Sequence, residues 1–341
     1  MRLATIENTL KTILTRSVDA IIFGFVEPLK DKRTLKLVAF LALFIVVMSL
    51  VLTAAVFMLF KPYADNPSSM AALTSNMSAA IGFLAYFFVM VIALAIIQSI
   101  IVNLIDVMAI FRALEMKSFI PKAQVGIMSA LKLIVVNICV TLFAFFSVFN
   151  LKMLVILAVS ALLLIAGIAV IVLFQANMGL VFVGMTLVLL GAIVFAAYMI
   201  VFYYNSLRLM FSPIIFVEKD LGVIDSCKAS WTKTEGQVLG LFVATIVLSV
   251  LLTILMFAAS ILAQVYSAVA TLINPGISDL ALSVDPIYIV LSLPIYVFSA
   301  YAVIVGSFFI TSLYASLSGK THTGVVVEKN APKRPFFSKK K

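Results

Sequence analysis

Charge is what this sequence has least of: 11% of its residues are charged, whereas 64% are hydrophobic. A soluble domain is roughly a quarter charged and about half apolar, so this chain lacks the polar groups that a water-exposed surface needs. The surrounding solvent is therefore expected to be lipid, in which a helix satisfies its own backbone hydrogen bonds. The composition predicts an all-α polytopic integral membrane helical bundle.

Histidine and cysteine are also scarce: His322 is the single histidine, and Cys139 and Cys227 are the two cysteines. Metal and haem sites in helical bundles usually draw several such ligands from facing helices. We therefore expect no metal and no cofactor. Two cysteines cannot build a disulfide framework, so we expect both thiols to be free.

Apolar residues instead gather in long blocks. A helix needs about 20 apolar residues to cross a hydrocarbon core of ~30 Å. Blocks that reach this length set the limits of the expected transmembrane domain at 37 and 317. They are 37–60, 79–105, 131–205, 238–265 and 287–317.

Basic residues set the expected orientation, because cytoplasmic loops carry an excess of Lys and Arg. Of the 24 basic residues, only Lys61 and Lys152 lie outside four polar segments. We expect these segments, and with them both termini, on the cytoplasmic side of the cell membrane, and the loops 61–78 and 266–286 outside. The basic segments are the N-terminal segment 1–36, the linkers 106–130 (with Lys132 just beyond) and 206–236, and the tail 318–341.

The central block poses a problem of parity. Two cytoplasmic linkers require an even number of spans between them, yet the block divides most naturally into helices over 131–149, 153–174 and 180–205. We resolve this with two full spans and one apolar segment that re-enters the membrane or lies buried against the bundle, since protein can cover such irregular segments. This gives six spans; seven is the alternative.

The two ends of the chain are expected to contact the membrane surface. In 1–36, apolar residues recur at helical spacing with basic residues between them, which predicts a basic amphipathic helix on the lipid surface. The tail is predicted to be disordered and to contact anionic headgroups. Nucleic acid is not expected as a partner, because no folded basic domain accompanies the tail. The tail residues expected at the headgroups are Lys333, Arg334, Lys339, Lys340 and Lys341.

The linker 206–236 is the densest run of charge between the apolar blocks and is predicted to form an interfacial elbow. Pro213 cannot continue a helix, and Ser226 is expected to cap a short helix that begins near Cys227. Trp231 is expected among the headgroups, and Gly236 at the turn into the next span. The elbow residues are Pro213, Glu218, Ser230, Trp231 and Gly236.

Part of this linker resembles a known family signature. Pro213, Glu218, the pair Ser230-Trp231, and Thr234 with Gly236, ahead of an apolar helix, are similar to a pattern in a loose group of prokaryotic multi-helix membrane families. The named member is the membrane domain attached to some glycerophosphodiester phosphodiesterases. FVEPLKDKRTLKL, near the N-terminus, resembles the segment that leads into the first span of related archaeal families. The resemblance implies six spans. The catalytic phosphodiesterase domain is not found in this sequence, so that activity is not implied.

Polar side chains inside the apolar blocks are mostly amides and hydroxyls, whose usual role is hydrogen bonding between helices. Asn103, Asp106, Asn137 and Asn205 could alternatively line a polar groove. Small residues spaced by four, such as Ala192 with Ala196, are expected where helix backbones approach closely. No paired carboxylates, Ser–His arrangement or phosphate-binding loop can be assembled, so we expect no enzyme.

Two functions remain open from the sequence. The first is a non-catalytic scaffold, an accessory subunit of a membrane complex, or a lipid-organising protein. The second is a permease or channel for a small, weakly charged or lipid-like solute, and a membrane enzyme ranks third. The partners expected are the lipid bilayer with its anionic headgroups, and either another membrane protein or a second copy of the chain.

Overall fold

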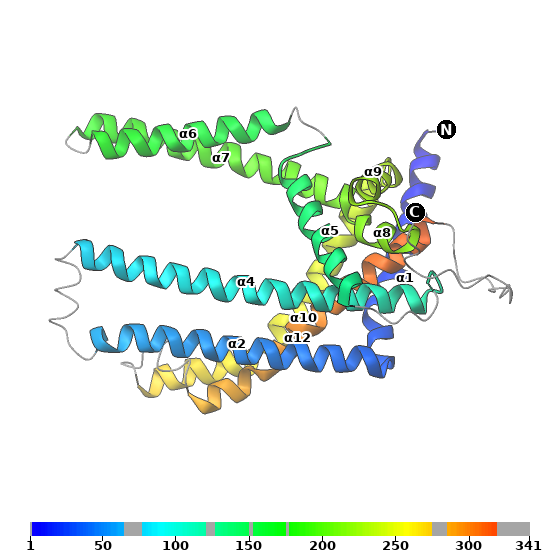
Figure 1. The fold of residues 1–341 in the computed structure, drawn as a ribbon, viewed down its shortest axis with the longest axis horizontal. Coiled ribbons are helices and arrows are strands. Elements are labelled where there is room, and N and C mark those ends of the chain that lie inside the picture. The colour runs from blue at the N-terminus through cyan, green and yellow to red at the C-terminus, as the bar shows by residue number, and fades with distance from the viewer. Residues whose placement is uncertain are drawn as a thin grey trace. The chain divides into compact units, whose positions relative to one another are not determined.

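The computed structural model describes residues 2–64, 77–120, 127–149, 153–174, 177–274 and 285–318. Within these ranges the regular elements are all helices (Figure 1). Six of them are long and apolar enough to cross a membrane, which makes this an all-α polytopic membrane protein with six spans. The basic tail residues Lys333, Arg334, Lys339, Lys340 and Lys341 lie outside the described residues.

The helices follow the predicted blocks but extend beyond several of them, because a helix does not end where the hydrocarbon core ends. α4, for example, continues past Ile105 to Met116. In chain order the helices are α1 (Arg2–Lys30), α2 (Lys32–Ala64), α4 (Met77–Met116), α5 (Ile127–Phe145), α6 (Leu154–Leu173), α7 (Met178–Leu209), α8 (Ser212–Lys219), α9 (Val223–Lys233), α10 (Val238–Ile273) and α12 (Pro286–Leu317).

The chain divides into two compact units. Unit 1 is drawn from Met1–Ile134 and Ala244–Thr321, and the described part of unit 2 is Val135–Val243. Unit 1 therefore holds α1, α2, α4, α12 and most of α10, whereas unit 2 holds α6 to α9 and the C-terminal part of α5.

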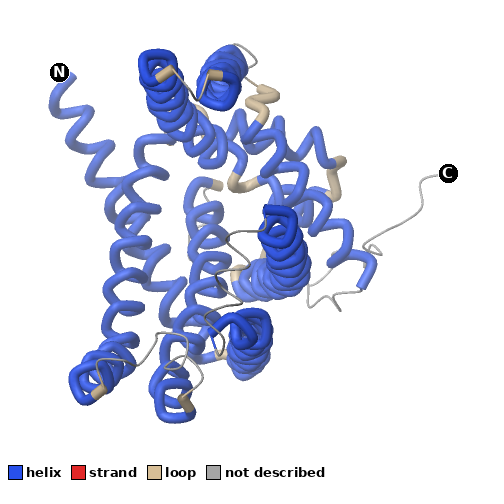
Figure 2. The backbone as a smooth tube through the Cα atoms, turned by 90° about the vertical axis from the view of Figure 1, so that its left-hand side faces the viewer, coloured by secondary structure: helices blue, strands red, loops and turns tan. Residues whose placement is uncertain are grey.

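In unit 1, α1 runs across the axis of α2 instead of continuing it (Figure 1, Figure 2). α1 packs closely against α12 at Gly24, where an added Cβ would lie 3.1 Å from the Val305 carbonyl oxygen. Beside this contact the ring of Phe23 stacks on that of Phe308, with 5.7 Å between centroids. The lack of a side chain at Gly24 thus lets the backbones of the two helices meet.

The core of unit 1 lies toward one end of its spans. In α12, Ile304, Phe308 and Tyr314 are buried, whereas Val290 and Val297 in the first half of the helix are exposed. α2 and α4 show the same asymmetry at their ends nearest the basic segments 1–36 and 106–130. Apolar side chains exposed along a span are what a lipid solvent permits, because lipid tails are as apolar as they are.

The core of unit 2 includes a tight hairpin of α6 and α7, which lie side by side (Figure 1). Small residues recur every seven positions on each helix, at Ser160 and Gly167 on α6 and at Gly184 and Gly191 on α7. The antiparallel register pairs Ser160 with Gly191, whose carbonyl accepts a hydrogen bond of 3.0 Å from the Ser160 hydroxyl. It also pairs Gly167 with Gly184: a Cβ at Gly167 would lie 2.7 Å from the Gly184 carbonyl oxygen.

The prediction of close packing at Ala192 and Ala196 is wrong, because both side chains are exposed on α7. Gly191, one residue before Ala192, is buried in the hairpin. One residue turns a helix by about 100°, so neighbouring small residues lie on different faces. Composition alone did not indicate which face meets α6.

α5 is a third helix of the central block, between the polar linkers 106–130 and 206–236. α6 and α7 are among the six helices long and apolar enough to span, whereas the fully described part of α5, Leu131–Phe145, is not among them. Ala144, near the end of α5, is buried, and Tyr198 of α7 donates a hydrogen bond to the neighbouring Phe145 carbonyl. The central block therefore supplies two of the six long apolar helices, and the end of α5 packs against α7.

We expect Gly167→Ala to loosen the hairpin, because the new methyl group would overlap the Gly184 carbonyl. Overpacking of this kind costs about 1–3 kcal/mol and should lower the melting temperature of the purified protein in detergent. Gly306→Ala on α12 is the matched control, since nothing lies within 4 Å of its Cβ position. Equal melting temperatures for the two variants would contradict the proposed contact.

Candidate functional site

The predicted elbow is built around Arg208, a buried residue in the last turn of α7 with 8% of its surface exposed. Its guanidinium donates three hydrogen bonds within unit 2. Nε donates to Thr234 Oγ1 at 3.1 Å, and Nη1 donates to Tyr204 Oη at 2.9 Å. Nη2 donates to the Trp231 carbonyl oxygen at 2.6 Å. One side chain thus ties the end of α7 to the end of α9.

The backbone of Arg208 completes the connection in the opposite direction. The Ser230 hydroxyl donates to the Arg208 carbonyl at 2.8 Å and accepts from the Phe211 backbone N–H at 3.3 Å. Helix ends leave backbone groups without helical partners, and here Ser230 satisfies one at the end of α7 and another at the start of α8. The contacts of Ser230, Trp231 and Thr234 with Arg208 give part of the family-like signature a structural reason.

The charge of Arg208 is stabilised by dipoles and by an aromatic face. The Trp231 carbonyl lies in the last turn of α9, where the helix dipole is negative. The guanidinium carbon lies 4.3 Å from the centre of the Trp231 ring, in a cation–π contact. Phe149 stacks on the same indole, with 5.3 Å between centroids. These contacts hold the elbow in place, so the charge of Arg208 has a structural role.

The remaining elbow residues lie as follows. Pro213 is in the first turn of α8, where a proline costs no hydrogen bond, and Glu218 is near the end of that helix. Gly236 has a φ of +74°, the left-handed conformation expected at the turn before α10. The prediction for Ser226 is wrong. α9 begins at Val223, and the Ser226 hydroxyl donates back to the Gly222 carbonyl at 2.9 Å within that helix.

The four residues of the candidate groove are divided between the units. Asn103 and Asp106 lie on α4 in unit 1, whereas Asn137 on α5 and Asn205 on α7 lie in unit 2. The Asn103 amide bonds within its own helix, at 2.8 Å from the Ser99 carbonyl oxygen. A groove lined by all four residues stays a prediction.

Asn205 and Asp106 each connect two helices. Asn205 Nδ2 donates to the Ala144 carbonyl at 3.2 Å and to Ser147 Oγ at 2.9 Å, so this buried amide caps the end of α5. Among the described residues, no partner is found for Asn205 Oδ1. Asp106 of α4 accepts a hydrogen bond from the Ser307 hydroxyl of α12. Both residues therefore act between helices, which is the usual role of polar groups in spans.

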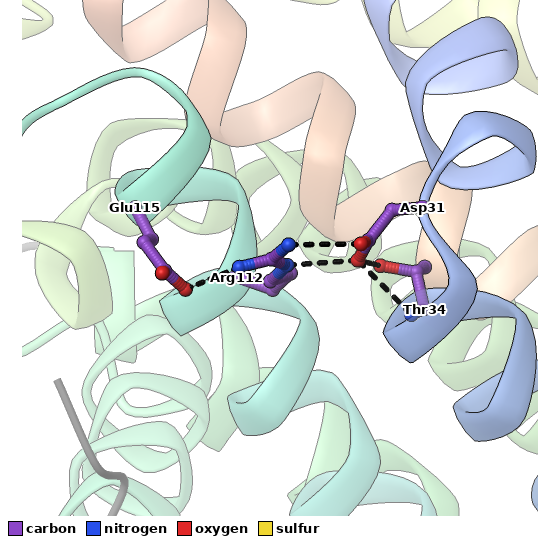
Figure 3. A network of polar contacts seen from close by, with 4 residues as sticks. All are labelled: Asp31, Thr34, Arg112 and Glu115. Carbon is purple, nitrogen blue, oxygen red and sulfur yellow. Dashed lines mark hydrogen bonds and ion pairs between the residues drawn. The ribbon is translucent and has the colours of Figure 1, made fainter. Parts of the chain in front are cut away.

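Figure 3 shows an ion-pair network in unit 1 that the sequence did not reveal. Arg112 of α4 binds Asp31, between α1 and α2, with two bonds of 2.8 Å from Nε and Nη2. Its Nη1 lies 2.5 Å from Glu115 Oε2. Asp31 also accepts from the Thr34 backbone N–H at 3.1 Å and so caps the first turn of α2. The corner where α1 meets α2 is thus attached to α4.

The only visible signal for this network is the spacing of Asp31 and Thr34, which is typical of a helix N-cap. The partner Arg112 is 81 residues away in sequence. The guanidinium beside Asp31 holds the pKa of that carboxyl well below its usual range, with the Thr34 hydrogen bonds acting in the same direction. The carboxylate is therefore the form that the native fold favours.

In the described part of the chain no cluster of three or more His, Cys, Asp or Glu could hold a metal ion. Both cysteines are free thiols, and burial raises the pKa of Cys227. Comparisons with protein families, with curated proteins and with solved structures find no match to this chain. The resemblance to the glycerophosphodiester phosphodiesterase-linked membrane domains stays a prediction.

We expect Arg208→Lys to loosen the elbow, because a lysine cannot reproduce the forked contacts or the stacking on Trp231. Hydrogen bonds to charged groups contribute about 1.5–3 kcal/mol, so the melting temperature should fall. Trp231 is the only tryptophan, so its fluorescence should change as well. Arg33→Lys is a matched control on an exposed residue. Unchanged fluorescence and stability in Arg208→Lys would rule out the role assigned to Arg208.

We also expect Asp31→Asn to destabilise the protein at neutral pH. Because the native pKa of Asp31 is lowered, its stabilising contribution is full above the ordinary value of about 3.9 and is lost as the pH falls below it. The melting temperatures of wild type and Asp31→Asn should therefore differ at pH 7 and converge in acid. Glu27→Gln, which removes an exposed pair with Lys30, should have little effect. A difference that grows in acid would refute this account.

Proposed function

We propose that this multi-pass membrane protein is a non-catalytic scaffold, either an accessory subunit of a membrane complex or a lipid-organising protein. The observation that carries the proposal is that several of its polar side chains join helices to one another. Arg208, Asn205 and the Asp31–Arg112 pair all join one helix to another within the chain. These groups serve the architecture, and the surface that the spans present outward is apolar.

The α6–α7 hairpin supports the same proposal. Apart from the seam between the two helices, large apolar side chains are exposed along both. In a membrane such faces meet either lipid or the spans of another protein. Two examples on each helix are Leu162 and Ile165 on α6, and Phe182 and Leu189 on α7, each more than half exposed.

One observation favours the alternative of a permease. One face of α12 carries Ser292, Tyr296, Ser299 and Ser307, which follow one another at spacings of four, three and eight residues. Ser307 bonds to Asp106, and Tyr296 lies 3.0 Å from the Ser49 hydroxyl of α2. A carboxyl group inside a span often marks a solute or proton path. This polar seam in unit 1 is where a permease would hold water.

Solvent access at the polar seam separates the two functions. In a variant with Cys139 and Cys227 replaced by alanine, we expect Ser299→Cys to resist a charged, membrane-impermeant thiol reagent, because a scaffold needs no water there. Lys32→Cys is the accessible control, and the apolar Leu293→Cys the lipid-facing control. Labelling of Ser299→Cys at the rate of Lys32→Cys would reject the scaffold and support the permease.

Purification in a mild detergent then distinguishes an accessory subunit from a lipid-organising protein. A chain that co-purifies in a fixed ratio supports an accessory subunit. A protein that purifies alone, with an unreactive Ser299→Cys, supports lipid organisation.

A further inference from the structure

α1 presents three distinct faces in the part whose side chains are described. The face against α12 is small and buried, and includes Gly24. A second face carries charged residues, such as Arg16 and Asp19, which are exposed. The third face is apolar and also exposed: Val18 is 46%, Ile22 54%, Val26 37% and Leu29 57% exposed.

These four apolar residues, here called the α1 stripe, are spaced by four, four and three, so they form one line along the helix. An exposed line of large aliphatic side chains is unfavourable in water, at roughly 25 cal/mol for each Å² that stays uncovered. The packing of α1 on α12 leaves the stripe uncovered in unit 1. Something outside the described fold must therefore cover it.

A group of cations adjoins the end of the stripe. Lys32, Arg33 and Lys36 are exposed in the first turns of α2, and we call them the basic corner. None of the three pairs with a carboxylate among the described residues. Asp31, which lies beside them in sequence, is engaged by Arg112. The positive end of the α2 dipole adds to the charge of the corner. The corner thus carries unneutralised positive charge.

The direction of α1 relative to α2 places the stripe and the corner where the surface of the membrane would lie. α1 runs across the axis of α2, which is a span (Figure 1). Exposed apolar side chains also lie within the corner, at Leu35, and beyond it, at Phe40 and Leu43 of α2. A helix that runs across a span, with an apolar face and cations at its end, has the composition of a helix that lies in the headgroup region.

We propose that the α1 stripe and the basic corner together form a docking site for the anionic phospholipids of one leaflet. The stripe enters the boundary between headgroups and acyl chains, and Lys32, Arg33 and Lys36 bind the headgroup phosphates. Charge complementarity selects lipid: a protein partner would require an acidic, apolar groove, whereas an anionic leaflet offers both features and already surrounds α2. The Asp31–Arg112 pair holds the corner in place on α4. The inference applies equally to a scaffold and to a permease.

The first test places a spin label at residue 22 of the full-length protein, as Ile22→Cys with Cys139 and Cys227 replaced by alanine, in phosphatidylcholine–phosphatidylglycerol nanodiscs. We expect high collision rates with oxygen and low rates with a water-soluble nickel chelate, as in lipid. Arg16→Cys is the matched control on the charged face and should show the reverse. Low rates with both reagents at residue 22 would mean that protein covers the stripe. High nickel rates there would mean that water does. Either result overturns the proposal.

The second test measures how much phosphatidylglycerol, relative to phosphatidylcholine, stays bound after detergent extraction. The triple variant Lys32→Gln, Arg33→Gln, Lys36→Gln should lose this enrichment, by about fivefold for each cation near the surface. The control keeps the charge: Lys32→Arg, Arg33→Lys, Lys36→Arg should behave as wild type. Equal enrichment in the neutral triple variant and wild type would overturn the assignment of the basic corner to phospholipid.

Discussion

The fold depends on one constraint: the ends of its helices must find polar partners in a chain that has few polar groups. Lipid offers no hydrogen bonds to the backbone groups left free at helix ends. Arg208 satisfies the end of α9, Asn205 the end of α5, and Asp31 the start of α2. Asp285 does the same for α12, accepting from the Ile287 N–H at 2.7 Å. Much of the scarce polarity is thus placed at helix ends, where its absence would cost most.

Between the helix ends, the two units pack by different means. The α6–α7 hairpin of unit 2 relies on small residues in register, where Gly167 and Gly184 bring two backbones together. Unit 1 relies on large side chains near one end of its spans, where Phe308 and Tyr314 are fully buried. Lipid explains both solutions. It supplies no hydrophobic driving force between spans, so helices associate either by close backbone contact or through groups anchored near the polar ends.

The sequence predicts features that depend on composition and local order, and misses those that depend on distant pairs. Apolar length predicts the six long apolar helices, and Gly236 marks a real turn. Periodicity says nothing about Arg112, which meets Asp31 only after α4 has folded back beside α2. The sequence predicts the elbow but not its central residue, because Arg208 stands at the end of a span, where a basic residue usually reaches the headgroups.

The same constraint bears on function. A polar side chain that closes a helix end can bind a solute only by leaving a backbone group without its partner, which costs about 1–3 kcal/mol when that group is buried. Arg208, Asn205 and Asp31 already have this structural role at helix ends. Asp106 differs, because it accepts a hydrogen bond from the Ser307 side chain of a neighbouring helix and does not cap a helix end. The path for a solute that the permease alternative requires would begin from this pair.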